Sequence, residues 1–310
     1  MSNTICSCAN PSFPVLGRPD CVLEMKAVAF PIIVPRFKAD GSRNTIDLTS
    51  ATLGADIKAL IATSTATLER IYPFPRCENV NFERTDTVFE TAPSTRKYKI
   101  ANVGGVRTFR FELWSKDAVH NILRELKKLG CSDVDFFMVD VSGSLWGILD
   151  NPTDTVMRGY EMATETFDAF KDYATDTTVQ KLMVSWDLDN AEAEENSYGI
   201  SSEALGYSAT TLKPLTSANI KLEEISSTVI QFTVTEPDGS YAGSPVVSLV
   251  TSGANFSVTA DGVAVAGTPL ETSDGVYSFT HSATINVGDL VVGSIASAVG
   301  YDIADGSYTA

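Results

Sequence analysis

The stretch RTFRFELWSKDAVHNILRELKKLGCSDVDFFMVDVSGSLWG, residues 107–147, sets the architecture expected for the first part of the chain. Over its first eight residues apolar and polar side chains alternate, which predicts a β-strand with one face on a core and the other face polar. The apolar positions are Phe109, Phe111 and Leu113, and the polar positions are Thr108, Arg110 and Glu112. We expect the apolar face to pack on the helix that comes next in the chain.

That helix is predicted over residues 116–129. Ser115 is a suitable N-cap, and Gly130 is expected to end the helix. The apolar residues recur at helical spacing and form one stripe that a core can bury. They are Val119, Ile122, Leu123, Leu126 and Leu129. His120 lies beside this stripe, and we expect its side chain to be solvated.

The apolar run at 136–139 ends at Asp140, which is followed by the turn sequence VSGS. An acid at the end of a buried strand is either a catalytic carboxylate or an ordinary hairpin residue. An aspartate nucleophile or base needs a second acid, a lysine or a metal ligand at a defined place, and the sequence DVSGS supplies none. We therefore interpret Asp140 as a hairpin residue, because Asp and Gly are typical of turns. An enzyme that uses Asp140 is the less favoured alternative.

Alternating or apolar runs predict further strands at 78–91, 155–162 and 179–189. In the last of these, the residues that share a face are Leu182, Val184, Trp186 and Leu188. Residues 48–65 predict a short amphipathic helix. The long polar connection at 90–106 is expected to reach a partner or to carry function, and it has room for a strand at 98–100.

Residues 1–45 are rich in prolines and are interpreted as an extended N-terminal arm. Prolines exclude a helix there and limit any strand, such as VAFPIIVP at 28–35, to an edge or a short piece. The arm either packs on a neighbouring molecule or lies on its own domain. Cys6, Cys8 and Cys21 lack the second close cysteine pair of a zinc site, so we assign no metal, and plain thiols are the favoured interpretation.

The composition changes after residue 205. Residues 206–217 are interpreted as a Ser/Thr-rich linker around Pro214, and residues 218–310 as a small β-sandwich of Ig-like layout. The predicted strands lie within 227–240, 244–253, 256–267, 274–283 and 288–297. Asp-Gly pairs at 238–239, 261–262 and 274–275 are strong hairpin signals. Residues 46–205 are then the first folded domain.

Bulk properties narrow the class of protein. The chain has 310 residues, 44% of them hydrophobic, and a formal net charge of -16. That charge argues against nucleic-acid binding as the main activity, although it permits a polyanion to pass without adhering. No run is apolar enough for a membrane span, no secretory signal is evident, and five cysteines fit reduced thiols made in the cytosol.

Tests for catalysis return no site. No phosphate-binding loop, dinucleotide fingerprint, zinc-protease motif or Cys-x-x-Cys occurs, and His120 and His281 are not near a nucleophile motif. The acidic stretch DLDNAEAEE at 187–195 begins like a calcium loop, but Glu192 stands where that loop needs glycine, so we expect a solvated turn. We assign no catalytic, cofactor-binding or metal residues and predict that the protein is not an enzyme.

The order of elements over residues 60–205 resembles the tail tube subunits of tailed bacteriophages. The likeness rests on the alternating strands, the helix in SKDAVHNILRELKKLG, and the long loop ETAPSTRKYKIANVGG before it. The C-terminal region, from NIKLEEISSTVIQFTVTEPDG onward, is similar to the Ig-like modules of phage tails and capsids. The resemblance implies a mainly β fold, with a sandwich or half-barrel tube-type domain, one main α-helix and a C-terminal Ig-like β-sandwich.

The resemblance also implies a function. Tube subunits form hexameric rings by joining their sheets into a closed inner barrel, and the rings stack around an acidic channel that conducts DNA. The partners would be other copies of the chain, other tail or capsid proteins and, transiently, viral DNA, with no membrane. The protein would reside in the virion after synthesis in the host cytoplasm. In such a ring the face with Arg110 and Glu112 would line the channel.

Beside the enzyme that uses Asp140, three alternatives stay open. A capsid decoration or head-fibre protein would bind a shell through residues 1–205 and occur as a monomer or trimer. A surface adhesin or pilin-like protein would suit the Ig-like module, but the absence of a signal peptide speaks against it. The third alternative is a monomeric sandwich whose polar face meets bulk water.

Overall fold

The computed structural model describes residues 23–310 apart from 63–64, 86–88, 92, 94–96, 100–105, 115–119, 152, 190–195, 238–242 and 297. The protein is mainly β, as predicted, and divides into two compact units with the main boundary between Lys213 and Pro214. The helices of the first unit are short: α1 (Leu53–Ala59), α2 (His120–Leu126) and α3 (Ser202–Leu205).

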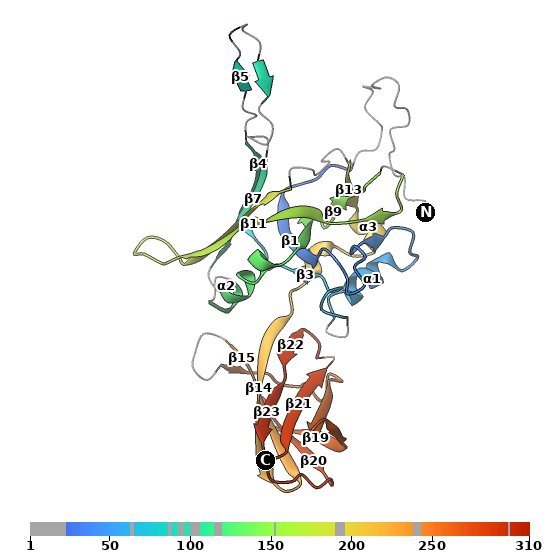
Figure 1. Cartoon of the computed structure of the whole chain (residues 1–310), viewed down its shortest axis with the longest axis vertical. Coiled ribbons are helices and arrows are strands. Elements are labelled where there is room, and N and C mark those ends of the chain that lie inside the picture. The colour runs from blue at the N-terminus through green and yellow to red at the C-terminus, as the bar shows by residue number, and fades with distance from the viewer. Residues whose placement is uncertain are drawn as a thin grey trace. The chain divides into compact units, whose positions relative to one another are not determined.

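The strands of the first unit belong to two layers and smaller pairings (Figure 1). They are β1 (Val28–Pro35), β2 (Ile46–Asp47), β3 (Tyr72–Pro73), β4 (Glu78–Arg84), β5 (Phe89–Thr91), β6 (Lys97–Lys99), β7 (Arg107–Trp114), β8 (Val134–Asp140), β9 (Leu145–Ile148), β10 (Val156–Met157), β11 (Tyr160–Asp172), β12 (Lys181–Leu188) and β13 (Ser197–Ile200). The strands predicted at 78–91, 107–114, 136–140, 155–162 and 179–189 are confirmed, with changed bounds, and so is the helix predicted within 48–65, which spans Leu53–Ala59.

Strand β11 links the two layers. Through Tyr160 and Glu161 it pairs with β8. Strand β8 also pairs with β1 and, near its end, with β9, and β9 in turn pairs with β13. From Met162 to Asp172 the same strand pairs with β12, which continues the sheet to β7 and β4. A bulge between Ala163 and Asp168 accompanies this change of partner. Bulges bend a strand and increase its twist, so one strand can serve both layers.

Aromatic side chains fill the space between the layers. Phe109 and Trp186, on β7 and β12, stand 5.4 Å and 5.1 Å between ring centroids from Phe136 on β8. On β12 the alternation predicted from the sequence is confirmed, because all four apolar residues are at most 3% exposed: Leu182, Val184, Trp186 and Leu188. Rings at such distances in tilted or edge-on arrangements stabilise a core beyond the area they bury.

The main predicted helix is present and shorter than expected. Helix α2 is described from His120, and the predicted N-cap Ser115 lies outside the described residues. A 3-10 turn, Leu129–Cys131, follows the helix and lies against β11. Leu126 is buried and the neighbouring apolar residues are half-buried, so the predicted stripe does face the core.

Strand β1 corrects the prediction of an extended arm for residues 28–35, whereas residues 1–22 of that predicted arm lie outside the described residues. Residues 28–35 form an eight-residue strand in the core layer, between β8 and the segment 72–77. Pro31 is tolerated because its carbonyl accepts a hydrogen bond from Phe74 N on the side away from β8, so its missing N–H removes no bond from the β8 ladder. Periodicity alone could not show this, since a strand buried on both faces gives an unbroken apolar run.

The second unit is a two-sheet sandwich. Its strands are β14 (Thr216–Ser226), β15 (Val229–Glu236), β16 (Ser244–Pro245), β17 (Asn255–Ala260), β18 (Val263–Val265), β19 (Gly267–Ser273), β20 (Val276–His281), β21 (Leu290–Ala296), β22 (Tyr301–Ala304) and β23 (Gly306–Thr309). One sheet has the order β19-β20-β15-β14-β22 with β16 beside β15, and the other has the order β18-β17-β21-β23. Phe232 and Phe256 meet between the sheets at 5.5 Å.

Two predictions for this part of the chain are wrong in detail. Residues 244–253 form a strand only at Ser244–Pro245 and then turn, with Ser248 at φ 65°. The boundary between the two units falls within the predicted linker 206–217, but the part before Pro214 packs on the first unit, because Ala209 and Leu212 are buried and Ala209 N donates to Gly143 O. By contrast, Asp261 and Gly262 both have positive φ, as a two-residue hairpin between β17 and β18 requires.

A buried ion network fixes the junction of β1, β8 and β11. Asp135 is 1% exposed, and its carboxylate accepts hydrogen bonds from Arg36 Nε at 2.9 Å and from Arg43 Nη2 at 2.8 Å. The same arginines reach Glu161 at 2.6 Å and 3.0 Å. Burial raises the pKa of Asp135 in spite of both arginines, so the site strongly disfavours a charge that lacks its partners.

We expect Asp135→Ala to lower the free energy of unfolding of the first unit by about 3–5 kcal/mol, because two half-buried guanidinium groups lose a buried partner. Chemical denaturation measures the effect. The matched control is Glu125→Ala, which breaks the exposed pair with Lys128 and should cost no more than about 1 kcal/mol. Equal effects of the two variants would show that the network does not hold the junction.

Candidate assembly surface

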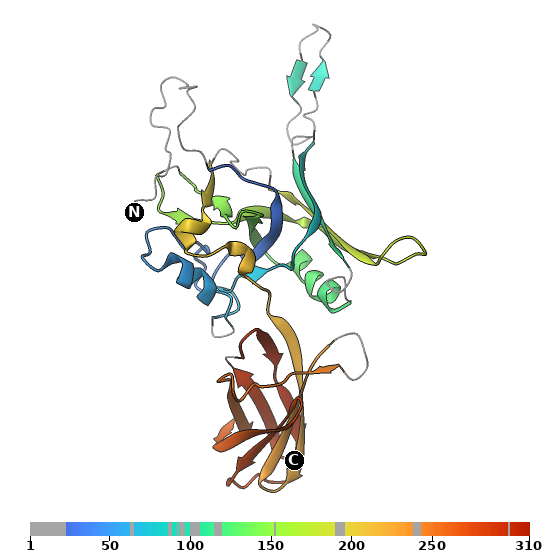
Figure 2. The same ribbon diagram turned by 180° about the vertical axis from the view of Figure 1, so that it is seen from behind.

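The sheet β4-β7-β12-β11 has two edges without a partner strand in the described part of the chain. Among the residues that the structure describes, β4 pairs only with β7, and Asp168–Asp172 of β11 pairs only with β12. Both views of the whole chain show the β11–β12 hairpin extending away from the remainder of the first unit (Figures 1 and 2). Open edges present unpaired N–H and C=O groups that pair readily with a further strand.

One face of this sheet is apolar and the opposite face is polar, as the alternation in RTFRFELW predicted. The polar side chains of that second face are Glu78, Asn81 and Glu83 on β4, Thr108, Arg110 and Glu112 on β7, Lys181, Ser185 and Asp187 on β12, and Asp168 and Asp172 on β11, and the same face also carries Trp114, Met183 and Phe170. Six of these eleven polar side chains are carboxylates and two are cations. The face therefore carries a negative field of its own, separate from the net charge of the chain.

Hydrogen bonds across the strands organise this polar face. Glu112 accepts from Asn79 Nδ2 at 2.9 Å, from Trp114 Nε1 at 2.6 Å and from Lys181 Nζ at 3.3 Å. Burial acts to raise the pKa of Glu112, but these donors outweigh it and lower the pKa below its ordinary value. Thr108 Oγ1 donates to Asp187 at 2.6 Å. These bonds order the polar face and hold Glu112 as a carboxylate.

The hairpin between β11 and β12 carries apolar side chains into solvent. Phe170 and Val179 are each 51% exposed, and Tyr173 is 66% exposed. Its tip is closed by Thr175 N, which donates to Thr178 O at 3.0 Å. Exposed apolar side chains on a protruding element are typical of a surface that another chain covers.

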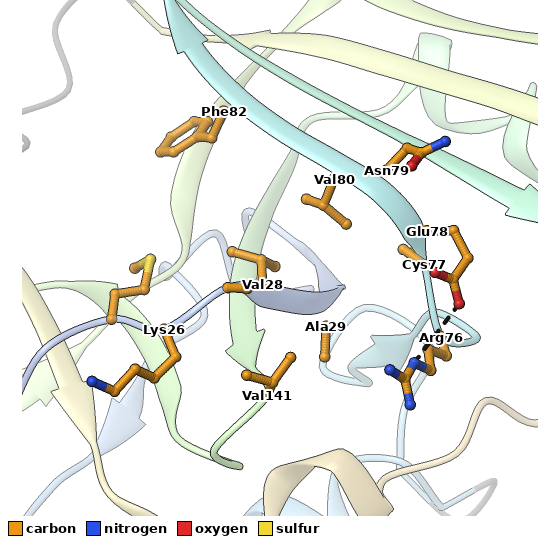
Figure 3. Close-up of a pocket in the computed structure, with 12 residues that line it drawn as sticks. Lys26, Val28, Ala29, Arg76, Cys77, Glu78, Asn79, Val80, Phe82 and Val141 are labelled. Carbon is orange, nitrogen blue, oxygen red and sulfur yellow. Dashed lines mark ion pairs between the residues drawn. The ribbon is translucent and has the colours of Figure 1, made fainter.

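A pocket of 440 Å³ lies beside β4, on the core-facing side of that strand. Val80 and Phe82 of β4 line one wall, and Val28 and Val141 line the other. Figure 3 shows Val80 and Val28 pointing toward one another. A bulge at Asn79, whose φ is 49°, turns the beginning of β4 around this pocket.

Two cations stand at opposite sides of the pocket mouth, Lys26 and Arg76 (Figure 3). The side chain of Arg76 is 78% exposed and lies 3.9 Å from Glu78. Cys77, next in the chain, is buried, and its Sγ donates to Pro75 O. The pocket is therefore lined by apolar side chains inside, and its rim carries Lys26, Arg76 and the carboxylate of Glu78.

Asp140 is a structural residue in the geometry observed. Its side chain accepts hydrogen bonds from the turn after it, from Ser142 N at 2.9 Å, Ser144 N at 3.0 Å and Trp146 Nε1 at 3.0 Å. Lys26 N donates to it at 3.3 Å. Burial acts to raise the pKa of Asp140, but the hydrogen bonds from Ser142, Ser144 and Trp146 outweigh it and lower the pKa. The carboxylate organises the β8–β9 hairpin that the sequence predicted.

We expect Asp140→Asn to lower the free energy of unfolding near pH 7 by about 2–3 kcal/mol, because an amide cannot accept from all these donors. A depressed folded pKa means that the carboxylate stabilises the fold above its unfolded pKa and loses this effect as the pH falls through the folded value. The gap between wild type and variant should therefore shrink below about pH 4. Denaturation at several pH values measures the gap, and a gap that does not change with pH would contradict this assignment.

The cysteines, the acidic stretch and the two histidines singled out in the sequence form no site in the described part of the chain. Cys6, Cys8 and Cys21, the acidic stretch at 190–195 and the side chain of His120 lie outside the described residues. His281 is buried in the second unit, with Nδ1 3.1 Å from Ala283 O. Among the described residues no group of His, Cys, Asp or Glu is arranged to hold a metal ion. In the same part of the chain, no helix has the length and hydrophobicity that crossing a membrane requires.

Sequence reasoning did not find the pocket, the projecting hairpin or the network around Asp135. The pocket joins residues that lie more than a hundred positions apart, from Lys26 to Val141, and no local pattern signals such a meeting. For the hairpin a weak signal existed, because the acids and aromatics at 168–176 continue the strand beyond its apolar positions.

No family model matches the chain, and no curated protein matches it. The crystal structure of the N-terminal part of the bacterial S-layer protein SbsC is similar at 18% identity over 35% of this chain and 26% of that one, with a TM-score of 0.22. The cryo-EM structure of the anti-feeding prophage cap, the AFP tube terminating cap, is similar at 8% identity over 61% of this chain and 99% of that one, with a TM-score of 0.25. Both TM-scores are low, and neither likeness supports a conclusion about function.

Proposed function

We propose that this chain is a structural virion protein, a tail tube subunit that assembles into stacked, hexameric rings around a channel for DNA. The observation that carries the proposal is the antiparallel sheet β4-β7-β12-β11, both of whose edges are open over the described residues. Its partners would be other copies of itself and other tail or capsid proteins. It would have no catalytic role and would reside in the virion.

Strand direction favours closure of such sheets into a ring. The four strands alternate in direction, so β4 and β11 run oppositely at the two edges. When copies are related by rotation about a ring axis, β4 of one copy meets β11 of the next in antiparallel orientation. The sheet then continues from copy to copy, and closure removes every open edge.

Charge favours placing the polar face toward the channel. Six carboxylates against two cations per copy would give the channel a negative wall, which repels a DNA backbone and lets it move without adhering. The apolar face of the same sheet is already covered by β8 and by the turn after α2. The capsid decoration alternative predicts monomers or trimers, and no feature of the described residues favours it over rings.

Proline substitution at two consecutive positions of β4 tests the edge pairing. Successive N–H groups of a strand point to opposite edges. One of the two variants, Glu83→Pro or Arg84→Pro, therefore removes an N–H that faces β7, and the other removes an N–H that faces the open edge. Both side chains are exposed, so neither variant loses core packing. We expect the variant with wild-type thermal stability to form no rings or tubes in negative-stain electron microscopy.

The outcome that contradicts edge pairing is a stable proline variant that assembles like wild type. Dispersed single particles of the wild-type chain at high concentration would contradict the proposed function itself. The variant with lowered thermal stability is the internal control, because it identifies the N–H group that the β7 ladder uses.

A further inference from the structure

The hairpin tip and the pocket beside β4 belong to opposite edges of the same sheet. Rows of side chains cross the sheet, and one row runs from Glu78 through Glu112 and Met183 to Phe170. Two residues further toward the tip on β11 is Asp172, and two residues before Glu78 on the other edge is Arg76. If copies join with these rows in line, Asp172 of one copy faces Arg76 of the next.

We propose that the β11–β12 hairpin of one copy binds in the β4 pocket of the next copy, an inference that rests on the proposed ring. In this arrangement Asp172 pairs with Arg76 and Tyr173 enters the pocket. The occupant of the pocket is thus a second copy of this chain. Arg76 and Asp172 are both exposed within one copy, which leaves them accessible to such a partner.

The two faces of β11 agree with this arrangement. Successive side chains of a strand point to opposite faces, so Tyr173 points to the core-facing side when Asp172 lies on the polar side. The pocket also opens on the core-facing side of β4, where Val80 and Phe82 line it. A largely exposed tyrosine, 66% accessible, would bury its ring there while its hydroxyl stays near the rim.

Charge selects this register over its neighbour. A slip by two residues would bring Asp172 opposite Glu78, and like charges directly opposite one another destabilise a sheet. In the proposed register the acid meets a guanidinium at the rim of the pocket instead. Asp168 would then lie near the neutral side chain of Asn81, two rows away from the pair of Asp172 and Arg76.

A reciprocal charge exchange tests the pairing. Asp172→Arg alone gives Arg against Arg at every junction, and Arg76→Asp alone gives Asp against Asp. When the two variants are mixed, a ring of alternating copies has an opposite-charge pair at every junction, formed by the two introduced residues at one junction and by the native Asp172 and Arg76 at the next. We expect each variant alone to raise the critical concentration for assembly about tenfold, and the mixture to assemble more readily than either variant.

The measurement is the sedimenting fraction at increasing protein concentration, with electron microscopy of the pellets. The double variant that carries both changes in one chain restores an opposite-charge pair at every junction and should assemble close to the wild-type concentration. Asp133→Arg, which changes an exposed acid away from both edges, should assemble like wild type. If the double variant shows no recovery, or if neither single variant changes assembly, the hairpin is not the ligand of the pocket. If wild type itself never assembles, the ring and the docking both fail, so the two failures are distinguishable.

A second pair of variants tests the pocket without changing charge. Tyr173→Ser should raise the critical concentration about tenfold because an aromatic anchor is lost, whereas Phe170→Ser, on the opposite face of the same hairpin, should change it less than about threefold. Thermal unfolding confirms that both variants stay folded, since both rings are exposed. Equal effects of the two variants would overturn the placement of Tyr173 in the pocket.

Discussion

Arg36 and Arg43 hold Asp135 and Glu161 together at the point where β11 leaves one layer of the first unit and enters the other. This junction governs the remainder of the unit, because a single strand must pair with β8 at its beginning and with β12 along its remaining length. A buried ionic network adds little net stability compared with apolar packing, but it fixes one arrangement, since any other leaves charges without partners. Here it fixes the register of β1, β8 and the beginning of β11.

From that junction the sheet β4-β7-β12-β11 extends with a covered apolar face, an ordered polar face and, over the described residues, two open edges. Proteins usually protect open edges with charges, bulges, prolines or covering elements. This sheet carries a bulge at Asn79 and another after Ala163. The edge segments Asn81–Arg84 of β4 and Asp168–Asp172 of β11 lie outside these bulges and keep a regular register with their neighbours. The long hairpin then exposes aromatic rings at one edge and the apolar pocket lies at the other. In the proposed ring, both of these features would contact other copies of the chain.

Much of the fold was predictable from short-range patterns. The strand at 107–114, the strand at 181–188, the helix after Trp114 and the Asp-Gly hairpin at 261–262 all result from periodicity and turn chemistry, which act within a few residues. Errors arose where tertiary contacts override local rules. Pro31 lies in a core strand because its missing N–H points to the short segment 72–77, and residues 244–253 turn early because Glu271 accepts from Ser248 N. Ala209 and Leu212, in a stretch that resembles a linker, are buried.

Residue type and spacing along the chain were enough to predict the mainly β class, the two faces of β7 and β12, the place of Asp140 at a hairpin and the excess of acid. Folding in three dimensions was needed to show which edges remain open, which carboxylates share the polar face, and that Arg76 and Tyr173 stand at opposite edges of one sheet. Those relations join residues distant in sequence, and they arise from strand order and register, which no local pattern encodes.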